Sequence, residues 1–172
     1  MREAIEKVLA AFPRERSGSA PVDVPGLAAE VDRRYRIRTP ASLELIWREI
    51  GSGYFGTNKE LFIFGDGKSS LPRSSFLEWN AMDFWRDIYP QPEDGGPVFF
   101  GETCFGEQFG FRWEDDLCIP VVFVIDSFES FRLANDFDEF VRDILSDRDS
   151  MVDLRLLGAL VEELGPIPME NI

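Results

Sequence analysis

The strongest constraint on the fold is a run of short strand patterns enclosed by helical ones. Apolar, β-forming residues fill segments 98–101, 105–113 and 119–125, and the acidic triplet 114–116 separates the last two. Such segments, bounded by turn residues, are typical of antiparallel strands. The stretches before and after them carry apolar residues at helical spacing. The sequence therefore predicts one α+β domain over residues 1–172, with a mostly antiparallel sheet of about four to six strands flanked by helices.

Six stretches carry the apolar spacing and the boundary residues of helices. Thr39 and Pro40 form a start signal, because Thr can cap free N–H groups and Pro suits the first helical position. Asn135 is a second expected cap, with Asp136 and Asp138 in the first turn of its helix. We expect helices over about residues 2–12, from Pro25, from Thr39–Pro40 to Gly51, from Ser74 or Ser75 to Pro90, from Asn135 to Leu145, and an additional one over about 150–164.

The other segments are expected to be strands, turns and one long loop. Residues 60–64 and 131–133 have short strand patterns, and residues 53–56 are interpreted as a turn between two glycines. Residues 14–24 are rich in Ser, Gly and Pro, so we expect a flexible loop there.

The charged residues are distributed unevenly along the chain. Residues 74–172 contain 22 Asp and Glu against 6 Arg, a net charge of −16, whereas residues 1–73 contain 10 acids and 12 bases, a net charge of +2. A surface built by the second half therefore carries a negative field. Such a field attracts cationic partners and repels nucleic acid and anionic membranes.

The chain contains no histidine, which excludes several classes of enzyme. Ser–His–Asp and Cys–His catalysis need a base that titrates near pH 7. Zinc sites built on histidine are excluded as well, and the two cysteines do not have the spacing of a zinc knuckle. We expect no catalytic residue, cofactor or metal. An enzyme that uses paired carboxylates and a metal stays open as an alternative.

Three other motifs have simpler structural explanations. Gly67-Lys68-Ser69 resembles the end of a phosphate-binding loop, but Phe62 occupies the position where that loop needs glycine. The acidic stretch 135–139 lacks the glycine that a calcium-binding loop requires. The aromatic residues over 79–113 lack the basic groove that accompanies nucleic-acid stacking. We therefore expect no nucleotide, calcium or nucleic-acid ligand.

No segment of the sequence has the pattern of a membrane span or a signal core. The longest apolar stretch, residues 118–125, has eight residues, whereas a membrane helix needs about 20. Charged residues interrupt the first twenty positions, so we expect a cytoplasmic protein without membrane contact. In that compartment Cys104 and Cys118 are expected to be reduced and buried. A disulfide between them stays open, because neighbouring strands could bring them face to face.

Several of these elements match one known family in their order. Residues 40–53 combine a Pro-started helix with a Gly turn, and residues 61–65 form the next strand pattern. Residues 100–111 are a glycine-punctuated hairpin, and residues 133–140 are a strand end followed by a Phe-rich helix. Over about residues 25–146, this order resembles the SUKH superfamily, which includes a yeast cell-wall-synthesis regulator and many bacterial immunity proteins.

The resemblance implies a SUKH-like fold and a non-enzymatic role, because bacterial members typically bind and neutralise a toxin, often a nuclease. A nuclease presents a basic cleft that an acidic protein can occupy, so the charge argument agrees. We expect binding to a cognate toxin or another basic protein; the alternative is a regulatory or scaffold module that binds several host proteins. The expected partner-binding residues are acids on two predicted loops and one surface aromatic anchor: Glu93, Asp94, Glu114, Asp115, Asp116 and Trp79.

Overall fold

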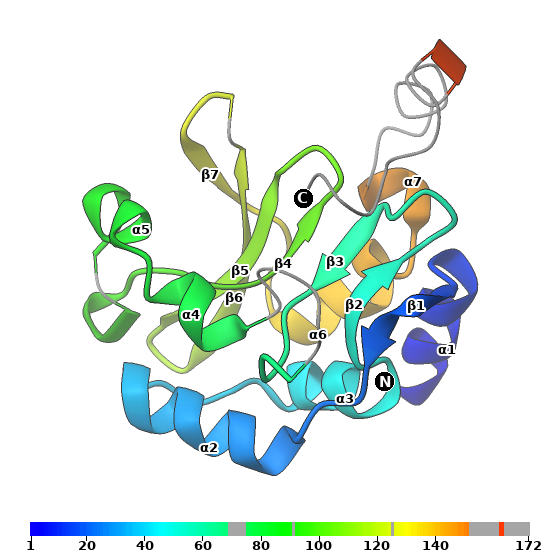
Figure 1. Cartoon of the computed structure of the whole chain (residues 1–172). Helices are drawn as coiled ribbons and strands as arrows, with labels where there is room; N and C mark the ends of the chain where they lie inside the picture. The colour runs from blue at the N-terminus through cyan, green and yellow to red at the C-terminus, as the bar shows by residue number, and fades with distance from the viewer. Residues whose placement is uncertain (69–74, 91, 125, 152–161, 164–172) are drawn as a thin grey trace.

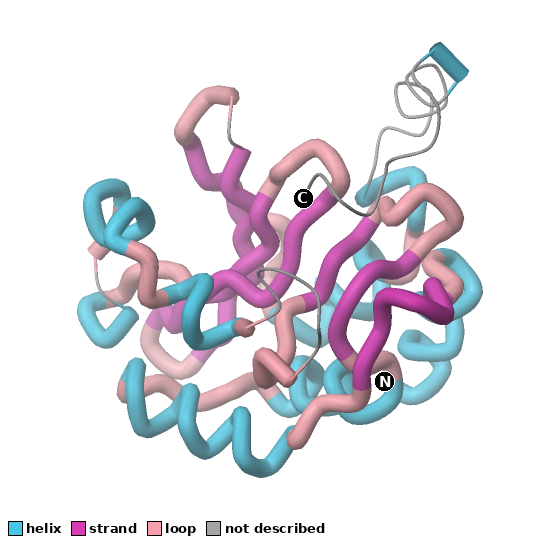
Figure 2. The backbone as a smooth tube through the Cα atoms, in the orientation of Figure 1, coloured by secondary structure: helices cyan, strands magenta, loops and turns pink. Residues whose placement is uncertain are grey.

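Seven strands form one antiparallel sheet in the computed structural model, and each strand pairs with the next one along the chain. The structure describes residues 1–68, 75–90, 92–124, 126–151 and 162–163, with the side chains of residues 15–19, 86 and 93 outside the description. Figure 2 shows the strands as one twisted layer with helices around it. The strands are β1 (Arg14–Ala20), β2 (Ser52–Phe55), β3 (Leu61–Ile63), β4 (Val98–Thr103), β5 (Gln108–Glu114), β6 (Leu117–Val124) and β7 (Glu129–Arg132).

Short helices surround this sheet (Figure 1). The expected α+β fold with an antiparallel sheet is confirmed, and the sheet has one strand more than the expected four to six. Within the described residues, every helix falls short of the length and apolarity that crossing a bilayer requires. The helices are α1 (Arg2–Ala11), α2 (Val24–Tyr35), α3 (Ala41–Glu49), α4 (Phe76–Asn80), α5 (Asp83–Ile88), α6 (Phe137–Glu139) and α7 (Arg148–Met151), with a 3₁₀ turn η1 (Pro92–Asp94) and a π-helical segment η2 (Phe140–Leu145).

The first three helices form where the apolar spacing predicts them. Val8 in α1, Val31 in α2 and Ile46 in α3 are each at most 1% exposed. Burying one such side chain contributes about 1.5–3 kcal/mol, so the apolar stripe of each helix fixes the helix against the core. The Asp23 side chain caps α2 by accepting a hydrogen bond from the Gly26 N–H at 3.3 Å.

Aromatic side chains form the core on both faces of the sheet. On one face Phe100 packs against Phe137 of α6, with ring centroids 5.4 Å apart. On the opposite face Phe99 packs against Trp85 of α5, with ring centroids 4.6 Å apart. Edge-on or tilted pairs of this kind add about 0.5–1.5 kcal/mol to the burial itself. The sheet is therefore packed on both sides, and its core does not depend on one face alone.

The single helix expected from Ser75 to Pro90 is wrong, because the structure has two short helices, α4 and α5. Ser75 is the cap of α4, as expected, and accepts a hydrogen bond from the Glu78 N–H at 3.2 Å. The Asn80 carboxamide accepts from the Phe99 N–H and donates to the Phe99 carbonyl, both at 2.7 Å. Asn80 thus makes the pair of hydrogen bonds with β4 that a neighbouring strand would make, and these bonds fix the end of α4.

Two expectations about the N-terminal half are also wrong. Residues 14–20 form strand β1, although the Ser- and Gly-rich composition of 14–24 predicts a flexible loop. Residues 52–55 form strand β2, although 53–56 is predicted to be a turn. The two segments pair with each other, Ser19 opposite Gly53. Pairing between them, and of β2 with β3 on its other side, supplies hydrogen bonds that neither composition indicates.

Two of the expected helix caps differ from the observed ones. Thr39 makes no cap for α3, because its hydroxyl and N–H both donate to the Asp32 carboxylate at 2.7 Å. Asp136 rather than Asn135 caps α6, and it accepts from the Glu139 N–H at 2.7 Å. The helix starts themselves lie close to their predicted positions.

A partly buried ion pair ties α7 to the segment before β3. The Glu60 side chain is fully buried just before β3, and it pairs with the half-buried Arg148 of α7. Removal of Arg148 would leave the buried Glu60 carboxylate without this partner, which is destabilising. The helix expected over residues 150–164 begins earlier, at Arg148, and most of its predicted length lies outside the described residues.

Candidate protein-binding site

The predicted acidic turn between β5 and β6 is present and exposed. Glu114 ends β5, and Asp115 and Asp116 form the turn before Leu117 begins β6. The backbone of Asp115 is left-handed, with a φ of +53°, a conformation that Asp tolerates better than most residues. Glu114 accepts hydrogen bonds from the Arg112 guanidinium at 2.6 and 2.9 Å, so part of its charge is neutralised. The unneutralised charge of the turn comes from the two aspartates.

The other predicted loop lies at the same end of the sheet. Val98, the first residue of β4, pairs with Phe111 of β5, so the segment before β4 and the end of β5 run out of the sheet side by side. Asp94 is exposed in η1 on that segment, whereas the side chain of Glu93 lies outside the described residues. The two loops chosen from the sequence thus share one edge of the molecule.

Trp79 is not a surface anchor, and that expectation is wrong. Its side chain is 8% exposed, and its ring stacks on Phe64 with centroids 5.2 Å apart. The indole N–H donates to the Gln108 side-chain oxygen at 3.0 Å. Gln108 in turn donates to the Glu102 carboxylate at 2.8 Å. Trp79 therefore belongs to a buried polar network on the sheet, and a partner has no access to its ring.

A hollow of about 260 Å³ opens beside the acidic turn, between β6, α6 and the segment that leads into α3. Three exposed carboxylates line it: Asp116 from the turn, and Asp136 and Asp138 from the start of α6. The sequence assigned the last two only to a helix start. Packing of α6 beside β6 brings them to the turn. The hollow is therefore the place where acids distant in the sequence meet.

Apolar groups complete the hollow. Leu117 is 56% exposed at its edge, and the Trp113 ring lines one wall. The Trp113 indole N–H donates to the Arg38 carbonyl at 2.9 Å, which fixes the ring. A few carboxylates around an apolar surface match the chemistry of a lysine or arginine side chain, which has an apolar stem and a cationic end. The hollow can thus hold a basic side chain of a partner.

The thiol of Cys118 reports the negative field in this hollow. Burial, followed by the charges of Asp136 and Asp138, raises the pKa of Cys118 to about 12. Cys118 is buried, as expected, whereas Cys104 is only partly buried, and both are free thiols. The two carboxylates are therefore close enough to the Cys118 thiol to act on its protonation.

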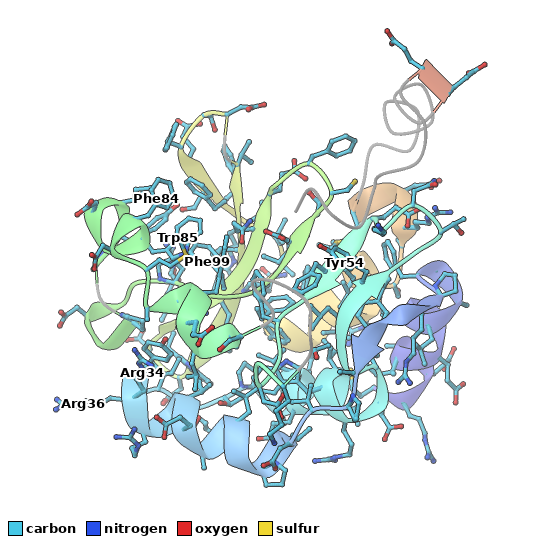
Figure 3. The ribbon with its side chains drawn as sticks, in the orientation of Figure 1. Arg34, Arg36, Tyr54, Phe84, Trp85 and Phe99 are labelled. Carbon is cyan, nitrogen blue, oxygen red and sulfur yellow. The ribbon has the colours of Figure 1, made fainter. Side chains whose placement is uncertain are left out.

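A group of arginines lies next to the acidic hollow and limits the reach of its field. Arg33, Arg34, Arg36 and Arg38 are exposed at the end of α2 and in the segment after it. Figure 3 shows Arg34 and Arg36 at this end of the molecule. Arg33 is paired with Glu30, whereas Arg38 itself lines the hollow. The folded chain therefore mixes the two signs of charge here, although the sequence separates them.

No group of His, Cys, Asp and Glu within the described residues could hold a metal ion. No family model matches this chain, and no curated protein matches it. The class that the fold and this site define is an α+β domain with an acidic, partly apolar hollow at one end of its sheet.

Proposed function

We propose that this chain is a non-enzymatic, cytoplasmic immunity protein that neutralises a cognate toxin with a basic binding surface, such as a nuclease. The observation that carries the proposal is the hollow lined by Asp116, Asp136 and Asp138 together with the exposed Leu117. Carboxylates at an exposed edge accelerate encounter with a basic partner, and an apolar residue among them supplies contact area once the complex forms.

In this proposal the acids act through their constant negative charge. Asp115 and Asp116 are exposed, and neither forms an ion pair with another described residue, so they remain available to a basic partner. The neighbouring arginines also constrain the orientation of the partner, because they repel any cationic part of it that approaches the end of α2. A partner must therefore place a cation in the hollow and keep cations away from the end of α2, which sets its orientation.

The first test is the gene neighbourhood, where we expect a large secreted protein with a basic C-terminal domain. The second is the association rate of this chain with that domain at several salt concentrations. Charge reversal in Asp115→Lys and Asp116→Lys combined should slow association by roughly tenfold at low salt and flatten its salt dependence.

Glu6→Lys is the matched control, because Glu6 is exposed on α1, outside the hollow. It should leave the association rate within about twofold. Equal rates for the double variant and the control would contradict the proposed site. Recovery of several weakly bound host proteins, in place of one tight partner, would favour the scaffold function instead.

A further inference from the structure

A second exposed surface lies at the other end of β6, away from the acidic hollow. It consists of Met82 and Phe84 at α5, Phe128 in the β6–β7 turn, and the outer edge of β7; we call it the aromatic surface. Met82 is 44% exposed, Phe84 42% and Phe128 59%. Large apolar side chains gathered at one exposed place are typical of interaction sites.

Both exposed rings rest on the same buried aromatic cluster. Phe84 lies edge-on to Trp85, with centroids 4.8 Å apart, and Phe128 lies edge-on to Phe123 at 6.1 Å. Trp85 and Phe123 contact each other at 5.5 Å. Figure 3 shows Phe84, Trp85 and Phe99 in order from α5 towards the sheet. The exposed rings are thus held on a rigid base, which limits the entropy lost when a partner binds.

The hairpin turn needs a left-handed residue at position 128, because the Phe128 N–H donates to the Val124 carbonyl at 3.0 Å while Glu129 pairs with Val124. The strain arises because that residue is Phe. Its φ is +57°, in the left-handed region that suits Gly, Asn or Asp and that is unusual for a bulky residue. Such a conformation costs on the order of 1–3 kcal/mol. The strain keeps a half-exposed aromatic ring at the tip of a hairpin. The contact with Phe123 offsets part of this cost, but Gly, Asn or Asp would adopt the turn without it, so a bulky ring kept at an exposed position points to a role outside the fold.

The cluster beneath also holds an unused hydrogen-bond donor. Trp85 is 3% exposed, and its indole N–H finds no hydrogen-bond partner among the described residues. Leaving a buried donor unsatisfied costs about 1–3 kcal/mol. One buried donor beneath the aromatic surface therefore lacks a hydrogen bond to the described residues.

The edge of β7 offers backbone groups to a partner. No described strand pairs with its outer side. Leu133 donates its N–H to the Pro120 carbonyl, so by strand alternation Phe131 and Glu129 also face β6, and the N–H and C=O groups of Ser130 and Arg132 point outward. An unpaired edge of this kind is a template for an added strand.

The charges around the aromatic surface select the occupant. Asp83 and Asp87 on α5, Asp126 in the turn and Glu129 on β7 are all exposed. The Arg132 side chain is engaged with the carbonyls of the segment that follows it. A second copy of this chain, paired edge to edge, would bring the same acids together, and like charges repel. A partner with basic side chains meets no such penalty.

We propose that the aromatic surface binds an extended, basic segment of another protein, which pairs with the outer edge of β7 as an eighth strand and contacts Phe84 and Phe128 through its apolar side chains. This surface is independent of the acidic hollow, because it lies at the opposite end of β6 and shares no residue with it.

The test is selection of displayed random 12-residue peptides on the full chain, followed by binding and NMR measurements with the selected peptide. We expect peptides of net positive charge with apolar residues at every second position. Their binding should shift the amide signals of Ser130 and Arg132 most. Phe128→Ser should weaken binding roughly tenfold or more, and Ser130→Pro should do the same by removing an outward N–H.

Ser130→Pro removes no bond to β6, so this variant tests the edge without disturbing the sheet. Glu6→Lys again serves as the distant control and should leave the affinity unchanged. No selected peptide, selected peptides without positive charge, or selected peptides that bind Phe128→Ser and Ser130→Pro at full affinity would each overturn the proposal. Dimerisation of the chain in place of peptide binding, seen by sedimentation, would overturn it as well.

Discussion

Strand β6 has a hairpin turn at each end, and the two turns place residues of opposite chemistry in a left-handed backbone conformation. Each turn has one residue in the left-handed region, Asp115 with a φ of +53° in the β5–β6 turn and Phe128 with +57° in the β6–β7 turn. Asp adopts that conformation more readily than most residues, and its charged side chain suits a solvent-exposed hairpin tip. Phe suits neither demand. The comparison teaches that the first turn is explained by folding alone, whereas the second keeps a residue that folding does not favour.

The surroundings of the two turns differ in the same sense. The β5–β6 turn opens on a hollow lined by carboxylates, whereas the β6–β7 turn rests on buried aromatic rings. We infer that the first end of the sheet recognises charge and the second recognises shape and backbone. The following predictions test this division, from the largest expected effect to the smallest.

Replacing one tryptophan in each region should give the largest difference between the two regions in the free energy of unfolding. Trp85→Ala should lower the free energy of unfolding by about 3–5 kcal/mol, because Trp85 is buried among Phe99 and Phe123. Trp113→Ala should cost less, about 1–3 kcal/mol, because Trp113 is only partly buried and loses one hydrogen bond to Arg38. Urea denaturation measures both values. Equal losses would show that the acidic end is packed as firmly as the aromatic one.

The two free thiols report on the two ends through their reaction rates. Burial, together with the charge of Glu60, raises the pKa of Cys104 to about 11, and burial with Asp136 and Asp138 raises that of Cys118 to about 12. The thiolate is the reactive form, so at pH 8 Cys104 should be alkylated by iodoacetamide roughly tenfold faster than Cys118.

Asp138→Asn should speed the reaction of Cys118, whereas Asp149→Asn, an exposed change on α7, should not. Both thiol pKa values lie above the ordinary 9.0, so the unfolded chain loses these protons first as the pH rises. The thiols therefore add no penalty below pH 9, and the stability of the fold should fall from about pH 9 upward. A Cys118 that reacts as fast as Cys104 would contradict the negative field in the hollow.

Exchanging the chemistry of the two turns should give small effects of opposite sign. Asp115→Phe places a bulky residue in the left-handed region and should lower the free energy of unfolding by about 1 kcal/mol. Phe128→Asn relieves the same strain and should raise stability by a few tenths of a kcal/mol, because the ring that it removes is 59% exposed. Thermal unfolding measures both. A loss above about 1 kcal/mol in Phe128→Asn would make Phe128 a structural residue.

Much of the fold could be predicted because its signals are local. The apolar spacing of α1 and α2 and the acidic turn at Asp115 and Asp116 follow from neighbouring residues. Strands β1 and β2 could not be predicted, because their glycines and serines form strands through pairing with distant partners, β1 with β2 and β2 also with β3. The break at Asn80 was likewise invisible, since its cause is the backbone of Phe99, nineteen residues away.

The candidate site was predictable in part for the same reason. The exposed acids of the β5–β6 turn follow from a hairpin pattern, but the approach of Asp136 and Asp138 depends on how α6 packs beside β6. Trp79 was misplaced because an aromatic residue early in a helix has no local mark of burial; its partner Gln108 lies on a distant strand. The immunity function and the SUKH resemblance stay predictions.

The order of the strands has a consequence for how the chain folds during its synthesis. Every strand from β1 to β7 pairs with its sequence neighbour, so a chain that emerges from its N-terminal end can add one strand at a time to a growing edge. Most sheet contacts are then close in sequence, which favours rapid folding. Such growth always leaves the newest strand unpaired on one side. The last strand added is β7, and no described strand pairs with its outer side, so growth of the sheet stops at the edge where an eighth strand can be added.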